Sequence, residues 1–183
     1  MEKNCMTWNR RYSEAHALYC KDKYPVAFEA SGGMTMKVDY PPVRSTNGLT
    51  RAVINFLLWN GHHAERINNM GIPVDKREIY TDVLGRKRQI GSLEWRKGTG
   101  TNGTADVHAD IVHKDYRFPI PVKLETKWAK DTQRDEQIKY QEIIEGKKGV
   151  YVIVKNIDQF FLWYDQFLVS LQHNSFTGVE TGK

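Results

Sequence analysis

Two stretches of alternating apolar and polar residues, 105–112 and 117–128, constrain the fold of this chain more than any other feature. A turn near Lys114-Asp115 separates them, so we expect two paired antiparallel strands. Side chains alternate across a strand, which gives this hairpin one apolar and one polar face. The apolar positions, which suit a shared core, are Val107, Ala109 and Ile111, then Val122, Leu124, Thr126 and Trp128. The polar positions on the opposite face are Asp106, His108 and Asp110, then Lys123, Glu125 and Lys127.

The register of this hairpin decides which polar side chains meet. If Asp115 and Tyr116 sit at the turn, Asp106 lies directly opposite Glu125, and a one-step change in turn length makes the two diagonal neighbours. Cβ atoms are about 5 Å apart in a direct pair and about 7–8 Å apart in a diagonal one. Two carboxylates this close repel each other unless a cation lies between them, and Mg²⁺ bonds oxygen at about 2.1 Å. The pair therefore suits one bridging metal ion that keeps several waters, which favours hydrolysis of a phosphodiester.

Lys127 shares the face of Glu125 and is placed to orient or deprotonate an attacking water, or to stabilise charge on a phosphate. Gly103 lets the chain turn sharply into the first strand, so that Asp106 enters at its start. The plainer interpretation is a solvated strand face with a surface ion pair of little value. Glu-x-Lys is a common tripeptide, and Glu145-Gly146-Lys147 is a second copy. The Asp on the paired strand and the polar helix that follows favour the site.

The other segments predict helices and strands in an order typical of α/β proteins. We expect a helix at 7–22, a linker or irregular arm at 24–45, and a helix that begins after the N-cap residue types Ser45-Thr46-Asn47 and ends at Gly61. The later elements are expected to be a strand at 62–69, a hairpin at 74–97, a glycine-rich loop at 98–104, a polar helix at 131–145, a buried strand at 149–155, and an aromatic-rich helix to about 171. This divides the chain into an N-terminal helical extension (1–45), a main domain (46–171) and a C-terminal tail (172–183).

The chain is moderately basic, with a formal net charge of +5 and an isoelectric point near 9.1. This fits an anionic partner, nucleic acid first, and fits an ordinary basic protein equally well. In the 74–97 hairpin, Ile79-Tyr80-Thr81 and Leu93-Glu94-Trp95 flank a basic tip. We expect its bases to contact DNA phosphates beside the site, with a solvated hairpin tip as the alternative. These bases are Arg86, Lys87, Arg88, Arg96 and Lys97.

Cysteine usage and hydropathy narrow the cellular location that we expect for this chain. Cys5 and Cys20 show no metal-ligand spacing and predict reduced thiols rather than a zinc site or a disulfide framework. No apolar run approaches the roughly 20 residues of a membrane span, and the polar start of the chain has no signal-peptide pattern. The expectation is a cytoplasmic protein with no membrane partner. The histidines His62, His63, His108 and His113 lack helical ligand spacing, although His108 shares the face of Asp106 and could touch substrate.

With these motifs in place, the chain resembles the PD-(D/E)xK nuclease superfamily, and within it the VRR-NUC type found in phage and bacterial proteins. Gly103–Asp106 is similar to the second motif of the family, and Val122–Lys127 is similar to its (I/V)-x-(D/E)-x-K strand. Gln137 stands where the family has a glutamine on the next helix. Gly149-Val150-Tyr151-Val152 resembles the following strand, and Ile157-Asp158-Gln159-Phe160 the opening of the last helix. The resemblance covers about residues 46–170.

The resemblance implies a restriction-endonuclease-like core, with a central mixed sheet flanked by helices. It implies Asp106 and Glu125 as Mg²⁺ ligands, with Mn²⁺ as a substitute, and the carbonyl of Thr126 as a further ligand. Lys127 would be the catalytic lysine, and Gln137 would support the site. Many family members place a Glu on the first helix, whereas here residues 47–60 contain no acid. Asn47 stands near that position and Glu65 is the nearest carboxylate, so one metal ion is expected rather than two.

These observations lead to a metal-dependent endodeoxyribonuclease, with a structure-selective enzyme for branched or four-way junction DNA as its specific form. The alternatives are a catalytically weak DNA-binding module of the same fold and an assembly protein that uses its terminal helices. The aromatic run Phe160-Phe161-Leu162-Trp163-Tyr164 is expected to be core, with a homodimer interface as the alternative.

Overall fold

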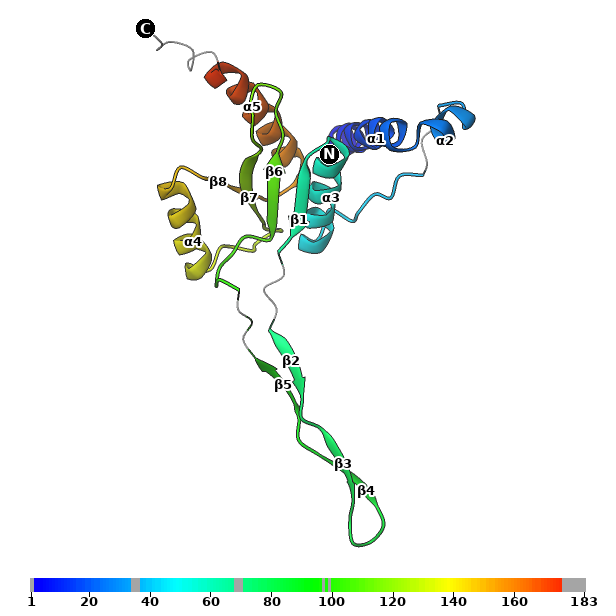
Figure 1. Ribbon diagram of the computed structural model, residues 1–183, viewed down its shortest axis with the longest axis vertical. Coiled ribbons are helices and arrows are strands. Elements are labelled where there is room, and N and C mark those ends of the chain that lie inside the picture. Colours follow the sequence, from blue (N-terminus) through cyan, green and yellow to red (C-terminus); the bar gives the residue numbers. More distant parts are fainter. Residues whose placement is uncertain (1, 34–36, 68–70, 97, 99, 176–183) are drawn as a thin grey trace.

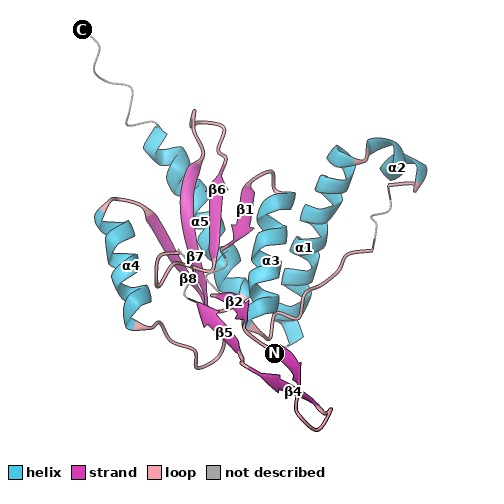
Figure 2. Ribbon diagram, turned by 60° about the horizontal axis from the view of Figure 1, so that its bottom comes forward, coloured by secondary structure: helices cyan, strands magenta, loops and turns pink. Residues whose placement is uncertain are grey.

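The computed structural model describes residues 2–33, 37–67, 71–96, 98 and 100–175. Its centre is a four-stranded mixed sheet in the order β1-β6-β7-β8. The strands are β1 (His63–Arg66), β6 (Val107–Ile111), β7 (Ile120–Thr126) and β8 (Val150–Val154). Neighbours run antiparallel except β7 and β8, which are parallel. The protein is therefore of the mixed α/β class, with helices on both sides of the sheet (Figures 1 and 2).

One face of the sheet holds the apolar core. Helices α3 (Thr46–Trp59) and α5 (Ile157–Ser175) lie against this face. The strands contribute the predicted apolar positions, because Val107, Ala109 and Ile111 alternate with less buried residues along β6. The opposite face at β7 and β8 is covered by α4 (Asp135–Gly146), whose Tyr140 contacts Tyr151 of β8. Polar residues on this second face are thereby enclosed rather than left in water.

The register of the central hairpin is the predicted one. Val107 pairs with Leu124 and Ile111 with Ile120, so extending the ladder by one residue places Asp106 opposite Glu125. The turn expected near Lys114-Asp115 is confirmed, because the Tyr116 N–H donates to the His113 carbonyl at 3.1 Å. The strands end earlier than expected, because the ladder stops at Ile111 and a loop at 112–119 joins them. A wider loop preserves the register because it adds equally to both strands. The burial of Val107 and Leu124 on one face resists a one-residue slip.

The N-terminal segment shares the main core. Helix α1 (Glu2–Lys23) agrees with the predicted helix and packs on α3. Tyr12 is fully buried there, with its ring 4.6 Å from that of Trp59 and its hydroxyl bonded to Asn55. The predicted linker at 24–45 is wrong in part, because Pro25–Ala30 forms a short helix, α2. The division of the chain at residue 45 stays a prediction.

The predicted hairpin at 74–97 is a long arm with different strand pairs. Strand β2 (Ile72–Asp75) pairs with β5 (Leu93–Arg96), and β3 (Glu78–Thr81) pairs with β4 (Lys87–Ile90). The expected pairing of 79–81 with 93–95 is wrong, because β4 takes that place. The arm extends away from the central sheet (Figure 1).

The end of the chain differs slightly from expectation. Helix α5 continues to Ser175, beyond the expected end near 171, and residues 176–183 of the predicted tail lie outside the described residues. The aromatic run lies in α5, and its interpretation as core is confirmed for Phe160, Phe161 and Tyr164, which are buried, whereas Leu162 is exposed. None of the described helices is both long and apolar enough to cross a membrane.

Candidate functional site

The predicted polar side chains meet at one end of the sheet. Asp106 immediately precedes β6, Glu125 lies near the end of β7, and Lys127 follows that strand. Gln137 stands in the first turn of α4, above the end of β7. The site thus draws on three elements that are separate in sequence.

Asp106 is held by the strand beside it. Its Oδ2 accepts a hydrogen bond from the Thr126 backbone N–H at 3.0 Å and another from the Thr126 hydroxyl at 2.7 Å. Thr126 Oγ1 lies 2.7 Å from Thr50 Oγ1 on α3, and both threonines are buried. The Thr50 hydroxyl donates its proton to the Thr46 carbonyl at 2.8 Å, so Thr50 packs beside Thr126 without supplying it a proton. The backbone N–H and the hydroxyl of Thr126 are thus the two donors that hold Oδ2 of Asp106.

Glu125 is buried, with only 1% of the residue exposed. Its Oε1 accepts from Gln137 Nε2 and lies 3.0 Å from Lys127 Nζ. Its Oε2 is also buried and has no hydrogen-bond partner among the described residues. Burial raises the pKa of Glu125, and the Asp106 charge raises it further, while Lys127 opposes both effects. The alternative interpretation, a solvated strand face, is therefore wrong at this position, because α4 covers it.

Lys127 is shared among three acceptors. Its Nζ lies 3.0 Å from Glu125 Oε1, 3.0 Å from Gln137 Oε1 and 3.6 Å from Asp131 Oδ2. The residue is only 6% exposed, so its ammonium is held at the site rather than in solvent. Gln137 connects the two charged groups, since its amide donates to Glu125 and its carbonyl accepts from Lys127. The predicted supporting role of Gln137 thus has a direct geometric basis.

The position of α4 depends on two close contacts. Gln137 Oε1 accepts from the Arg134 backbone N–H at 3.0 Å, which ties the side chain to the start of the helix. Gly103 has a φ of +75° and lies against the backbone of Glu136 and Gln137. A Cβ at residue 103 would be 2.8 Å from the Gln137 nitrogen and closer still to the Glu136 carbonyl. Glycine is needed here for the close approach of the loop to α4 as well as for the turn.

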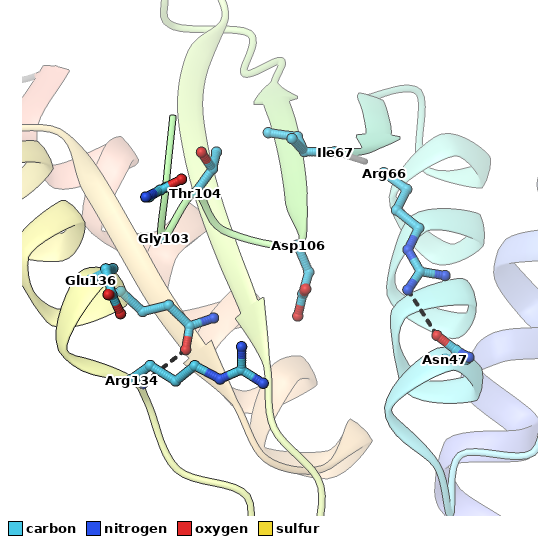
Figure 3. Close-up of a pocket in the computed structure, with 10 residues that line it drawn as sticks. Asn47, Arg66, Ile67, Gly103, Thr104, Asp106, Arg134 and Glu136 are labelled. Carbon is cyan, nitrogen blue, oxygen red and sulfur yellow. Dashed lines mark hydrogen bonds between the residues drawn. The ribbon is translucent and has the colours of Figure 1, made fainter. Parts of the chain in front are cut away.

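An open pocket of about 860 Å³ lies in front of Asp106. Figure 3 shows Arg134 on one side of Asp106 and Arg66 on the other, across the mouth of the pocket. Arg66 donates to Asn47 Oδ1 at 2.7 Å, which places Asn47 at the pocket as predicted. The pocket is lined by Asn47, Arg66, Ile67, Asn102, Gly103, Thr104, Asp106, Arg134, Glu136 and Gln137. Two arginines thus flank Asp106, and the pocket between them is large enough for a phosphate group.

Arg66, Arg134 and Glu136 were not predicted from the sequence. Arg66 ends an edge strand, and Arg134 stands directly before a helix, so neither belongs to a charge run or a motif. Their shared position at the pocket depends on the packing of α4 and β1 around β6 and β7. The adjacency of Glu136 to Gln137 was the one local signal that could have placed it near the site.

Other predicted residues are not brought to the pocket. Glu65 pairs with His108 across β1 and β6, and it is not among the pocket residues. His108 lies 3.0 Å from Lys123 Nζ and 3.5 Å from Asp110, one step along the strand face from Asp106. His62 instead bonds the Tyr164 hydroxyl at 2.6 Å. The carbonyl of Thr126 stays a predicted ligand, while its N–H and hydroxyl have the observed role of holding Asp106.

The basic residues of the arm also lie outside the pocket lining. Arg88 forms an ion pair with Asp82 at 2.7 Å, so its charge is partly neutralised. Within the described part of the chain, the side chains of Arg86, Lys87 and Arg96 form no ion pair. Lys97 lies outside the described residues. The prediction that these residues contact nucleic acid stays open.

The donor set fits one cation better than two. Within the described residues, no group of three or more His, Cys, Asp or Glu side chains could hold a metal ion. Asp106 and Glu125 each lie one residue beyond the Val107–Leu124 pair of the ladder, and the buried, unpartnered Oε2 of Glu125 is the kind of oxygen that a cation would satisfy. Oxygen donors of this type suit Mg²⁺, which keeps several waters when only one or two carboxylates bind it.

The fold and site together define a mixed α/β protein with a pair of facing carboxylates, a buried lysine and a glutamine beneath a pocket flanked by arginines. No protein-family model, curated protein or solved structure matches the chain.

Proposed function

We propose that this protein is a metal-dependent endodeoxyribonuclease with a restriction-endonuclease-like core, similar to VRR-NUC-type members of the PD-(D/E)xK superfamily. The observation that supports this most is the unsatisfied Oε2 of Glu125, buried opposite Asp106. An unpartnered buried carboxylate oxygen costs free energy that a divalent cation would recover. The raised pKa of Glu125 has the same origin, since burial and the Asp106 charge both disfavour its ionised form.

In this proposal Asp106 and Glu125 would hold Mg²⁺ or Mn²⁺, with the Thr126 carbonyl as a further ligand. A bound divalent cation lowers the pKa of water and polarises a phosphoryl oxygen. Lys127 Nζ lies among three acceptors, and in this proposal it holds the attacking water and stabilises charge on the phosphate. Gln137 keeps the Lys127 ammonium and the Glu125 carboxylate aligned.

Arg66 and Arg134 would bind the phosphate groups on either side of the one that reacts. Both line the pocket around Asp106, and guanidinium groups bind phosphate oxygens through paired hydrogen bonds. Asn47 fixes Arg66 by accepting its hydrogen bond. A pocket that is acidic at its centre and basic at its rim binds a cation and an anion together, as phosphodiester hydrolysis requires.

Substitution of the two carboxylates tests the proposal directly. We expect Asp106→Asn and Glu125→Gln to lower Mg²⁺-dependent cleavage of plasmid and branched DNA by about 10³-fold or more, because each removes a charge that holds the cation. Binding of DNA without metal should change by less than about threefold. The matched control is Glu145→Gln in the second Glu-x-Lys copy, where Glu145 is exposed at the end of α4. Cleavage that persists in both site variants, or that ignores a chelator, would refute the proposal.

Stability provides a readout that does not depend on catalysis. Mg²⁺ should raise the melting temperature of the wild-type chain, because a ligand that binds only the folded state stabilises it. The Glu125→Gln variant should show little or no such rise.

The second candidate is a catalytically weak DNA-binding module of the same fold. The absence of an acidic residue from α3 favours it, since the first helix then supplies only Asn47 to the pocket. This candidate predicts salt-sensitive DNA binding with no turnover in Mg²⁺ or Mn²⁺. A panel of linear, flap and four-way substrates separates the two candidates, and equal cleavage of all three would exclude structure selectivity.

A further inference from the structure

The arm, residues 71–96, is one continuous ribbon of two strands. The β2–β5 ladder pairs Ile72 with Arg96, and the β3–β4 ladder pairs Glu78 with Ile90 in the same register. Between the ladders the Lys76 N–H donates to the Ser92 carbonyl at 3.2 Å. Gly91, with a φ of +76°, lies so close to the Lys76 carbonyl that a Cβ would not fit. The arm is therefore a built element of defined register.

Apolar side chains are exposed on both faces of the arm. The ladder register puts Ile79 on one face and Tyr80 and Ile90 on the other, and all three are exposed. At the tip Val83 is 102% and Leu84 69% exposed. A two-stranded hairpin alone is marginally stable in water, and concentrated apolar exposure marks a contact surface. We therefore expect a binding partner that packs on these apolar side chains to stabilise the arm further.

The unpaired charges of the arm favour an anionic binding partner. Three ion pairs lie within it, joining Lys76 to Glu94, Arg77 to Asp75 and Arg88 to Asp82. The bases that remain outside these pairs are Arg86, Lys87 and Arg96, against the single acid Glu78. Two of these bases adjoin the apolar tip. A surface of apolar side chains with adjacent unpaired bases complements the sugars, bases and phosphates of nucleic acid.

The position and length of the arm relate it to the pocket. Its two strands connect to the core through Ile67 and through the loop that contains Asn102, and both of these residues line the pocket around Asp106. From Ile72 to Thr81 the ribbon spans about 30 Å at about 3.3 Å per residue. One turn of B-DNA is about 34–36 Å long. The ribbon alone is therefore nearly as long as one helical turn, and it begins beyond the pocket residue Ile67.

We propose that the arm lies along a groove of duplex DNA and grips it one helical turn or more from the phosphodiester bound at Asp106. Val83 and Leu84 contact the sugars and base edges, while Arg86 and Lys87 bind phosphates. This inference rests on the proposed nuclease function and adds to it a requirement for duplex on one side of the cut. DNA grooves admit a two-stranded ribbon, and proteins that bind grooves insert apolar side chains at the tips of such elements.

The test measures DNA binding by fluorescence anisotropy in EDTA. All variants carry Asp106→Asn, so that no DNA is cut, and the probes are labelled duplexes of about 8 and about 24 base pairs, below and above two helical turns. The first variant pair is Val83→Ser with Leu84→Ser, and the second is Arg86→Gln with Lys87→Gln. The control is Lys21→Gln with Lys23→Gln, which removes the same charge from exposed positions at the end of α1. These side chains are exposed, so the substitutions leave the core intact.

We expect both tip pairs to weaken binding of the long duplex by about tenfold or more, with less than about twofold effect on the short duplex. The variant with Arg86→Gln and Lys87→Gln should also reduce the slope of log K against log salt concentration by about two. The control should change affinity for the long duplex by less than about threefold.

Each other outcome overturns the inference. Equal affinity of tip variants and control for the long duplex would refute the arm contact and leave the nuclease proposal standing. If neither the long nor the short duplex binds, the arm contact and the nuclease proposal are both refuted. If the tip variants instead convert a dimer into a monomer by analytical ultracentrifugation, with DNA affinity unchanged, the arm binds a second copy of the chain and the inference is wrong.

Discussion

Replacing Gly103 by alanine tests how the loop before β6 positions α4. Gly103 has a φ of +75°, and a Cβ there would lie 2.8 Å from the Gln137 nitrogen and closer to the Glu136 carbonyl. Two costs add. The left-handed backbone costs an L-residue about 1–2 kcal/mol, and forcing a methyl group into a packed backbone contact costs a further 1–3 kcal/mol, roughly. We expect Gly103→Ala to lose about 2–5 kcal/mol of unfolding free energy.

Gly61 provides a matched control. It has a φ of +78° at the end of α3, and a Cβ there would meet no atom within 4 Å. Gly61→Ala should therefore lose only the backbone term, about 1–2 kcal/mol. Urea unfolding of both variants, with equal m-values, measures the difference. That difference, about 1–3 kcal/mol, is the contribution of the close approach between the loop and α4.

The same substitution has a functional consequence. To relieve the clash, α4 must move away from the loop and shift Gln137 relative to Glu125 and Lys127. A displacement of about 1 Å at a reacting centre lowers rate by about 100-fold. Gly103→Ala should therefore lose the proposed nuclease activity well below its unfolding temperature, while Gly61→Ala should retain it. If Gly103→Ala is no less stable than Gly61→Ala, the close contact of Gly103 does not position α4, and the inference that it positions Gln137 is also wrong.

Three further predictions follow from individual contacts. Thr126→Val should cost about 1–3 kcal/mol in urea unfolding and reduce metal-dependent cleavage, because Asp106 loses its hydroxyl donor; Thr126→Ser should restore both. Burial lowers the pKa of His62 to about 4, whereas the unfolded value is about 6.5, so the unfolded chain binds the extra proton below pH 6.5. Stability is thus full above that pH and should fall by about 2 kcal/mol between pH 7 and pH 5 from this group, a loss absent from His62→Gln when unfolding is compared at the two pH values. Arg134→Gln should raise KM for DNA and reduce the salt slope of binding by about one, and an unchanged slope would argue against a phosphate contact.

The central hairpin was predictable because burial repeats at every second residue. Val107, Leu124 and their neighbours specify which face enters the core, and that choice fixes the register even though the joining loop is longer than expected. The arm lacked this constraint. Its residues are exposed on both faces, so no burial pattern distinguishes the observed partner of β3 from the segment at 93–95. The pairing of an exposed ribbon depends on its turn at Asp82, whose side chain accepts from Leu84 and Arg86.

The site shows a similar division. Local alternation predicted that Asp106 faces Glu125 and that Lys127 shares their side of the sheet. The burial of Glu125 was missed because a polar strand face gives no sign of what covers it. That cover comes from α4, held by the contact at Gly103 and by Gln137. Arg66 and Arg134 were missed for the same reason, since each reaches the pocket only through packing between distant elements.

The burial of Glu125 and Lys127 raises the question of why charged side chains occupy buried positions. A buried ion pair is weak evidence for stability, because apolar residues of similar volume often stabilise a core as well or better. This pair is incomplete even as an ion pair, since Lys127 and Gln137 both bind Oε1 and leave Oε2 without a partner. Asp106, across the ladder, adds a second negative charge. Two negative charges that face one lysine, one of them on a buried carboxylate, destabilise the chain alone, and under the proposed function they would become favourable once a cation is bound between them.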